Sequence, residues 1–133
     1  MMLLGIDPGR SKTGLALVDE TGAIKSLHIA LMECFEEELV AFCNGAKLDA
    51  VVLGDGTNSK VVSNIVANVY PCLAQYVINE AYSTEEARKL YWEVNPPQGW
   101  KKLVPLGLLV PDEPMDAYAA VVQVRRWLQS GDK

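Results

Sequence analysis

The sequence predicts an α/β fold in which helices cover both faces of a mixed five-stranded sheet. Three apolar segments, at 2–7, 13–18 and 23–31, are separated only by short turns, which is typical of consecutive antiparallel strands. Beyond residue 33, segments with helical spacing alternate with short apolar runs at 50–54 and 75–79. Such strand-helix-strand crossovers predict that the last two strands are parallel.

The first hairpin contains the residue that stands out most. Its first apolar run ends at Asp7, the chain turns over Pro8 and Gly9, and a second apolar run continues through Val18. A carboxylate beside a core is costly unless it is paired, hydrogen-bonded or bound to a metal. Asp before Pro and Gly is also a common way to start a turn. The hairpin alone therefore leaves both interpretations of Asp7 open.

A helix is expected to begin near residue 33, because apolar residues recur there at helical spacing. These positions are Phe35, Leu39, Phe42, Cys43 and Ala46. The glutamates at 36–38 lie near its amino end, where the helix dipole favours acids, and Asn44-Gly45 can end it. The run at 50–54 is apolar throughout, as expected of a strand that is covered on both faces.

The second half of the chain predicts a helix, a strand and two more helices. An amphipathic helix around 61–69 stops before Pro71, and a short strand covers 75–79. Ser83 and Glu86 have capping-box spacing at the start of the next helix. The Pro- and Gly-rich segment 95–111 breaks the pattern, and a closing helix is expected over 115–129, with Asp116 in its first turn.

Composition predicts a single domain over residues 1–133 that folds without disulfides or a structural metal. Half of the residues are hydrophobic, and the three cysteines form no CxxC pair and no zinc spacing. The lone histidine, His28, is expected to be structural. No apolar run is long enough to cross a membrane, and the amino terminus does not resemble a signal peptide. We therefore expect a cytoplasmic protein without membrane contacts.

Acidic residues follow the predicted buried strands at the points where these strands end. They are Asp7, Asp55 and Glu80, and Asp116 opens the closing helix. The carboxyl ends of parallel strands meet at one edge of an open sheet, where functional sites gather. Carboxylates that gather without partner charges repel one another, so they are tolerated mainly where hard cations bind. Two Mg²⁺ ions bound there would suit phosphoryl-transfer chemistry on a phosphodiester, whereas each acid taken alone could be a helix cap or turn residue.

The motif Gly5-Ile6-Asp7-Pro8-Gly9, followed by Thr13-Gly14, resembles the first-strand motif of the RuvC-like branch of the RNase H superfamily. The remaining order resembles the YqgF (RuvX) family of Holliday-junction resolvases or pre-16S rRNA nucleases. There, a buried strand ends in Asp-Glu-Arg before a Thr-Thr helix start, and the last helix carries an Asp before an Ala-Ala pair. Here Asn79 to Thr84 and Met115 to Ala120 occupy those places.

The resemblance implies an RNase H-like fold and a nuclease that depends on Mg²⁺ or Mn²⁺. It places the catalytic, metal-binding triad on Asp7, Glu80 and Asp116, and Asp55 is an additional candidate ligand. The chain departs from the family at Asn79 and Ala81, which replace the aspartate and arginine that flank the glutamate.

Several cationic residues and one tryptophan are candidates for contacts with nucleic acid. They are Arg10, Lys12, Lys60, Lys101, Lys102 and Trp100, which would bind phosphates or stack on a base. Solvated lysines and a packing tryptophan are the alternative for each one taken alone. The net charge of −5 provides no general basic surface, so binding would be local and sensitive to salt.

Three functional hypotheses follow, in order of preference. The first is a metal-dependent nuclease acting on structured nucleic acid, either branched DNA or precursor rRNA. The second is a module of the same fold that binds nucleic acid or protein without catalysis. The third, an actin-like nucleotide-binding fragment, is disfavoured because the chain is short for two such domains and shows no second phosphate loop. A homodimer through 95–111 is a further expectation.

Overall fold

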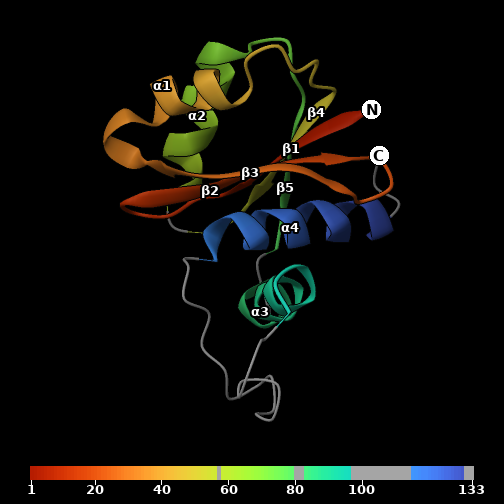
Figure 1. Cartoon of the computed structure of the whole chain (residues 1–133). Helices are drawn as coiled ribbons and strands as arrows, with labels where there is room; N and C mark the ends of the chain where they lie inside the picture. Colours follow the sequence, from red (N-terminus) through yellow and green to blue (C-terminus); the bar gives the residue numbers. More distant parts are fainter. Residues whose placement is uncertain (57, 80–82, 97–114, 131–133) are drawn as a thin grey trace.

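The computed structural model describes residues 1–56, 58–79, 83–96 and 115–130, which form a five-stranded sheet with helices on both faces (Figure 1). The strand order is β3-β2-β1-β4-β5. The strands are β1 (Met2–Asp7), β2 (Lys12–Asp19), β3 (Ile24–Leu31), β4 (Ala50–Gly54) and β5 (Gln75–Ile78). The first three are antiparallel, and β4 and β5 run parallel to β1. The predicted fold class and strand directions are confirmed.

The strand register brings the carboxyl ends of β1, β4 and β5 to one side of the sheet. Ile6 of β1 lies opposite Leu53 of β4, and Gly54 lies opposite Ile78 of β5. We call this side, where β1 ends at Asp7, β4 at Gly54 and β5 at Ile78, the carboxyl edge. The sequence prediction that these three strands end together is therefore confirmed.

The described helices divide between the two faces of the sheet (Figure 1). They are α1 (Phe35–Phe42), α2 (Ser59–Val69), α3 (Ser83–Val94) and α4 (Asp116–Ser130). Helices α1 and α2 cover one face, α4 packs on the other, and α3 packs against α4. Because α4 lies between the sheet and α3, most of its circumference is buried and apolar.

Alternation along the strands supplies both cores. Leu4 and Ile6 of β1 enter the core beneath α1 and α2, whereas Leu3 enters the core shared with α3 and α4. Successive strand residues point to opposite faces of the sheet, so Leu3, Gly5 and Asp7 all point to the same face. The same alternation that builds the two cores therefore turns Asp7 toward α4.

Two strand glycines allow α4 to approach the sheet closely. A side-chain carbon at Gly5 would lie 2.6 Å from the backbone oxygen of Ala120 and 2.6 Å from a Val124 methyl carbon. A carbon at Gly14 would collide with the backbone carbonyl of Asp116. Since no larger residue fits at either position, both glycines are required for this helix to lie where it does.

Several element boundaries differ from the predictions by one or a few residues, and two of the differences have a visible cause. Helix α1 stops at Phe42 and does not reach Ala46, because the chain turns there and Gly45 adopts a left-handed φ of +82°. Strand β3 begins at Ile24 because the amide of Ala23 donates to the carboxylate of Asp19 within the preceding turn. Among the described residues, no helix is both long enough and apolar enough to span a membrane.

Candidate active site at the carboxyl edge

Asp7 ends β1 and is held by a side chain from α4. Nε2 of Gln123 donates a hydrogen bond to Oδ1 of Asp7 over 3.0 Å. Gln123 is fully buried, so its amide approaches Asp7 from within the core rather than from solvent. Asp7 itself is only partly buried. The carboxylate therefore lies at the boundary between the core and the carboxyl edge, with its orientation set by a buried donor.

Asp116 begins α4 beside the same place. Its backbone lies directly over Gly14, and Gly14 is the antiparallel partner of Asp7. Partial burial raises the pKa of the Asp116 carboxyl above its ordinary value, while the nearby Lys12 acts in the opposite direction. The close packing of α4 thus brings two acids that are 109 positions apart in the chain, at 7 and 116, to one end of the β1–β2 hairpin.

Of the other two candidate acids, the structure describes Asp55 but not Glu80. Asp55 follows β4, is exposed, and donates its backbone amide to the carbonyl of Ile78 over 3.1 Å, which places it at the carboxyl edge. Glu80 lies outside the described residues, two positions after β5 ends at Ile78. Its assignment to the triad stays a prediction.

The cationic candidates Arg10, Lys12 and Lys60 are exposed. Arg10 and Lys12 belong to the β1–β2 turn and the start of β2, and Lys60 is in the first turn of α2. Lys60 lines a groove of about 250 Å³ between α2 and the ends of β4 and β5, with Leu53, Ser59, Ser63, Asn64 and Val77. Trp100, Lys101 and Lys102 lie outside the described residues, as does most of segment 95–111.

Asn58 connects the turn to the helix that carries Lys60. Its side-chain amide donates to the carbonyl of Gly9 over 3.0 Å, and its backbone is left-handed with φ of 71°. Asn tolerates this conformation better than most residues, and such strained positions cluster at functional sites. The bond ties the β1–β2 turn to the loop after β4.

Sequence reasoning missed both Gln123 and Asn58. Gln123 had one available signal: it is a lone polar residue within the apolar run 119–124, seven positions after Asp116 and therefore on the same face of the helix. Asn58 stood in a polar loop where its partner Gly9, 49 positions away, cannot be inferred from local pattern.

The carboxylates that the structure describes at the carboxyl edge suit a hard divalent cation. Carboxylate oxygens are its preferred protein ligands, and a bound cation would offset the cost of partly burying the Asp116 carboxylate. Within the ranges that the structure describes, no group of three or more His, Cys, Asp or Glu side chains could hold a metal. Of the expected metal ligands, the structure thus describes Asp7 and Asp116, and it describes the additional candidate Asp55, which is exposed and follows β4 at the carboxyl edge.

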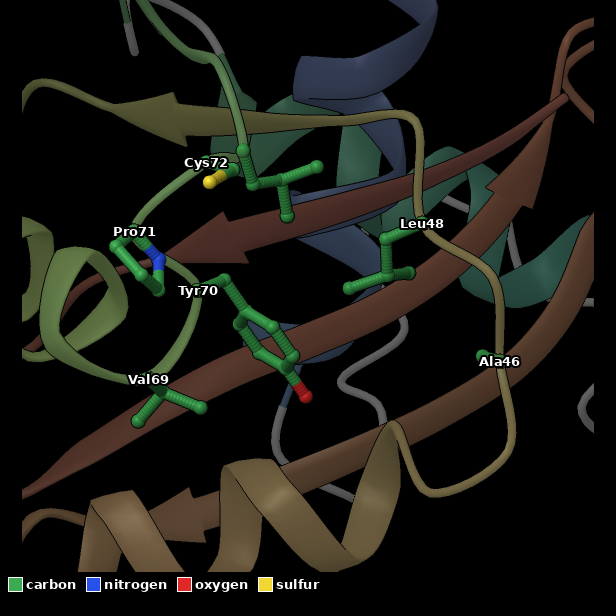
Figure 2. Close-up of a pocket in the computed structure, with 7 residues that line it drawn as sticks. Ala46, Leu48, Val69, Tyr70, Pro71 and Cys72 are labelled. Carbon is green, nitrogen blue, oxygen red and sulfur yellow. The ribbon is translucent and has the colours of Figure 1, made fainter.

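An apolar hollow of about 410 Å³ lies near the amino ends of β4 and β5, on the side of the sheet opposite the carboxyl edge (Figure 2). It is lined by the end of α2 and by the segments that lead into β4 and β5, including Leu48, Tyr70 and Cys72. Burial raises the pKa values of Tyr70 and of neighbouring Cys43. Since this hollow contains no acid or histidine in its lining and is remote from the carboxyl edge, it is not part of the candidate active site.

His28 also lies outside the candidate site. Its Nε2 is 2.8 Å from Oε1 of Glu38, and its ring stacks on Phe42 with centroids 5.7 Å apart. These contacts connect β3 to α1, in keeping with the structural role expected for His28. All three cysteines are free thiols.

Comparison with known proteins identifies the fold. No protein-family model matches the sequence, and no curated protein matches it significantly. Fowlpox virus resolvase, solved with substrate Holliday junction DNA, superposes with a TM-score of 0.61 at 13% identity over 100% of both chains. RuvC of Thermus thermophilus has a TM-score of 0.60 at 16% identity over 98% of this chain and 97% of that one. The same RuvC in complex with a Holliday junction gives 0.62 at 13% identity, over 98% and 96%.

These matches extend over almost the entire length of each chain, although sequence identity is low. They agree with the strand order and with the helices on both faces of the sheet. The narrower resemblance to the YqgF family stays a prediction. The chain therefore has the RNase H-like α/β fold of the RuvC resolvases.

Proposed function

We propose that this protein is a Mg²⁺- or Mn²⁺-dependent nuclease that cleaves phosphodiester bonds in structured nucleic acid, either branched DNA such as a Holliday junction or precursor rRNA. The observation that carries the proposal is an arrangement at the carboxyl edge of an RNase H-like sheet: Asp7 ends β1, and the backbone of Asp116 lies over Gly14, the strand partner of Asp7. Similarity to resolvases that were solved with Holliday junction DNA supports this class of substrate.

Each residue has a definite role in this proposal. Asp7, Glu80 and Asp116 hold the cations, and Asp55 is an additional ligand candidate. Gln123 donates to one oxygen of Asp7, which favours one orientation of the carboxylate. When bound, the cations supply Lewis-acid activation of water and of the phosphodiester. His28 is not needed as a general base.

The nucleic acid approaches the carboxyl edge along its cationic residues. In this proposal Arg10 and Lys12, at the β1–β2 turn, and Lys60, in its groove, bind phosphates, which is supported by the exposure of all three side chains. We assign the same role to Lys101 and Lys102, base stacking to Trp100, and homodimer formation to segment 95–111. These assignments follow from the sequence.

Substitution of Asp7 tests the proposal directly. Asp7→Asn keeps the volume and the acceptor for Gln123 but removes the negative charge, so cleavage should be abolished while the fold is retained. Cleavage of four-way DNA junctions and of single-stranded RNA should be measured in parallel, with Mn²⁺ and with chelator. The control is Asp49→Asn, which alters an exposed acid whose carboxylate accepts from the amide of Met2. Cleavage by Asp7→Asn at the native rate would rule out this mechanism.

Binding without catalysis is the second candidate, favoured by the net charge of −5 and by Asn79 and Ala81 at the places of the family's aspartate and arginine. Calorimetric titration with Mg²⁺ and Mn²⁺ separates the two candidates. Saturable binding that is lost in Asp7→Asn supports the nuclease, whereas nucleic-acid binding without any metal binding supports the module.

A further inference from the structure

The groove that contains Lys60 lies where β4 and β5 end, on the face of the sheet that α1 and α2 cover. On the strand side it is lined by Leu53 of β4 and by its parallel partner Val77 of β5. Val77 is aliphatic but 64% exposed, and β5 is the outermost strand of the sheet. The groove therefore offers an apolar surface to a ligand at the carboxyl edge.

The helix side of the groove is polar and carries a positive charge. It is lined by Ser59, Lys60, Ser63 and Asn64 of α2. Lys60 and Asn64 are four positions apart, so they are neighbours on one face of the helix, and both are exposed. None of the described residues that line the groove is acidic, although the chain has a net charge of −5. A cation, an amide and an apolar surface thus face one small space.

Two side chains hold α2 against β5 and so maintain the groove. Oγ of Ser63 donates to Oε1 of Gln75 over 2.8 Å, and Nε2 of Gln75 donates back to the carbonyl of Ser63 over 3.2 Å. The bond from Asn58 to Gly9 ties the start of the same helix to the β1–β2 turn. Because these bonds anchor the first two turns of α2, the groove is formed before a ligand binds, which lowers the cost of binding.

We propose that this groove binds one unpaired nucleotide of the substrate. The inference rests on the proposed function, because it takes the substrate to be nucleic acid. Lys60 binds the phosphate, Asn64 hydrogen-bonds an edge of the base, and Val77 packs against the sugar or the base. An asparagine amide both donates and accepts, which matches the mixed donors and acceptors of a base edge.

Size and position narrow the ligand to a single nucleotide beside the cleavage site. Sites that enclose drug-sized ligands measure about 300–1,000 Å³. A groove of about 250 Å³ therefore excludes a double helix. The pairing edge of a base can reach Asn64 only when the base is unpaired. Since Asp7 turns toward α4 on the other face, a nucleotide in the groove flanks the one that is cleaved.

The chain offers matched controls for both sides of the groove. Asn68 is exposed and lies one turn after Asn64 on α2, outside the described lining, so Asn68→Ala affects helix formation as Asn64→Ala does. Val61 is 49% exposed and is also outside that lining. Val61→Glu therefore adds the same charge to the molecule as Val77→Glu, but not to the groove.

The test measures Kd by fluorescence anisotropy, in chelator so that no cleavage occurs. The probes are two DNA four-way junctions and two RNA hairpins, and in each pair one probe is fully paired and the other has a short unpaired stretch. We expect the native protein to bind the unpaired member of at least one pair more tightly. Asn64→Ala should weaken that binding about 5-fold and Val77→Glu about 10-fold, with little change for the paired member.

Asn68→Ala and Val61→Glu should keep native affinity for all four probes. Urea unfolding verifies that each variant is folded, and Asn64→Ala decides the test if Val77→Glu does not fold. Equal affinity of the native protein for both members of both pairs, or binding of no probe, would overturn the inference. Equal losses in the groove variants and their controls would overturn it as well.

The proposed nuclease is tested apart from the groove, by cleavage with Mn²⁺. Native cleavage without a preference for unpaired nucleotides would refute the groove inference alone. Cleavage that survives in Asp7→Asn would refute the nuclease mechanism, whereas the binding preference of the groove, measured in chelator, does not depend on that result.

Discussion

Gln123 shows how one buried side chain can determine the geometry of a candidate site. It is a polar residue surrounded by the apolar residues of α4, and its amide hydrogen bond to Asp7 connects the last helix to the first strand. Burying an amide without a partner is costly, so the bond to Asp7 also stabilises this packing. Asp7 thereby has a preferred orientation before any cation binds.

Replacing Gln123 should weaken metal binding more than it disturbs the fold. Gln123→Leu retains most of the volume but removes the donor, so Asp7 can rotate and Mn²⁺ affinity should fall about 10-fold. Calorimetry measures the affinity, and circular dichroism verifies that the variant is folded. Unchanged affinity in the folded variant would mean that Asp7 is held by other contacts.

Asp19 gives the protein a stability that depends on pH. The hydroxyl of Thr21 first, and then the amide of Ala23, lower the pKa of the Asp19 carboxyl from 3.8 to about 2. A lowered pKa in the folded state means that this stabilisation is complete above pH 3.8 and is lost as the pH falls toward 2. Urea unfolding from pH 2 to pH 7 should show this dependence for the native protein.

The same series on Asp19→Asn isolates this contribution. The variant should be less stable than the native protein at neutral pH, and the difference should shrink as the pH approaches 2. Lys25 lies 3.5 Å from Asp19 but is about half exposed, so the hydrogen bonds rather than the ion pair dominate. A constant difference across the series would contradict this assignment.

At the scale of whole elements, α4 is the helix that assembles the candidate site. It supplies Asp116 and Gln123, and it reaches the sheet over Gly5 and Gly14. The apolar residues of this helix predict only that it is buried, so their spacing does not show that the helix carries site residues. Its place over the β1–β2 hairpin depends on the absence of side chains at two strand positions.

Gly14→Ala should displace the start of α4. The added carbon would collide with the backbone of Asp116, which cannot move as a flexible side chain would. We expect a loss of stability of at least about 1 kcal/mol by urea unfolding, together with weaker Mn²⁺ binding, because Asp116 moves away from Asp7. Native stability and native metal affinity in this variant would show that α4 does not depend on the close approach.

At the scale of the whole molecule, the net charge of −5 means that nucleic-acid binding depends on a few local cations. Lys60→Ala should raise the Kd for a four-way junction and reduce the salt dependence of binding by about one unit of slope. The control is Lys47→Ala, an exposed lysine in the segment that leads into β4, far from the carboxyl edge. Equal effects of both variants would indicate that only overall charge matters.

Much of the fold was predictable because local pattern carries it. The apolar run at 50–54 predicted β4 at its observed limits, and the change from alternating to helical spacing after residue 33 predicted the switch from antiparallel to parallel strands. The exact start of β3 was not predictable, because it depends on the hydrogen bond from the amide of Ala23 to the carboxylate of Asp19.

The sequence by itself determined the α/β class, the order of the elements and the placement of Asp7 and Asp55 after strands that end together. These follow from residue periodicity, which acts over a few positions of the chain. Only the tertiary structure decided that Asp116 lies over Gly14 and that Gln123 donates to Asp7. Those contacts join residues 40 or more positions apart, and packing selects them through close approach that no local pattern encodes.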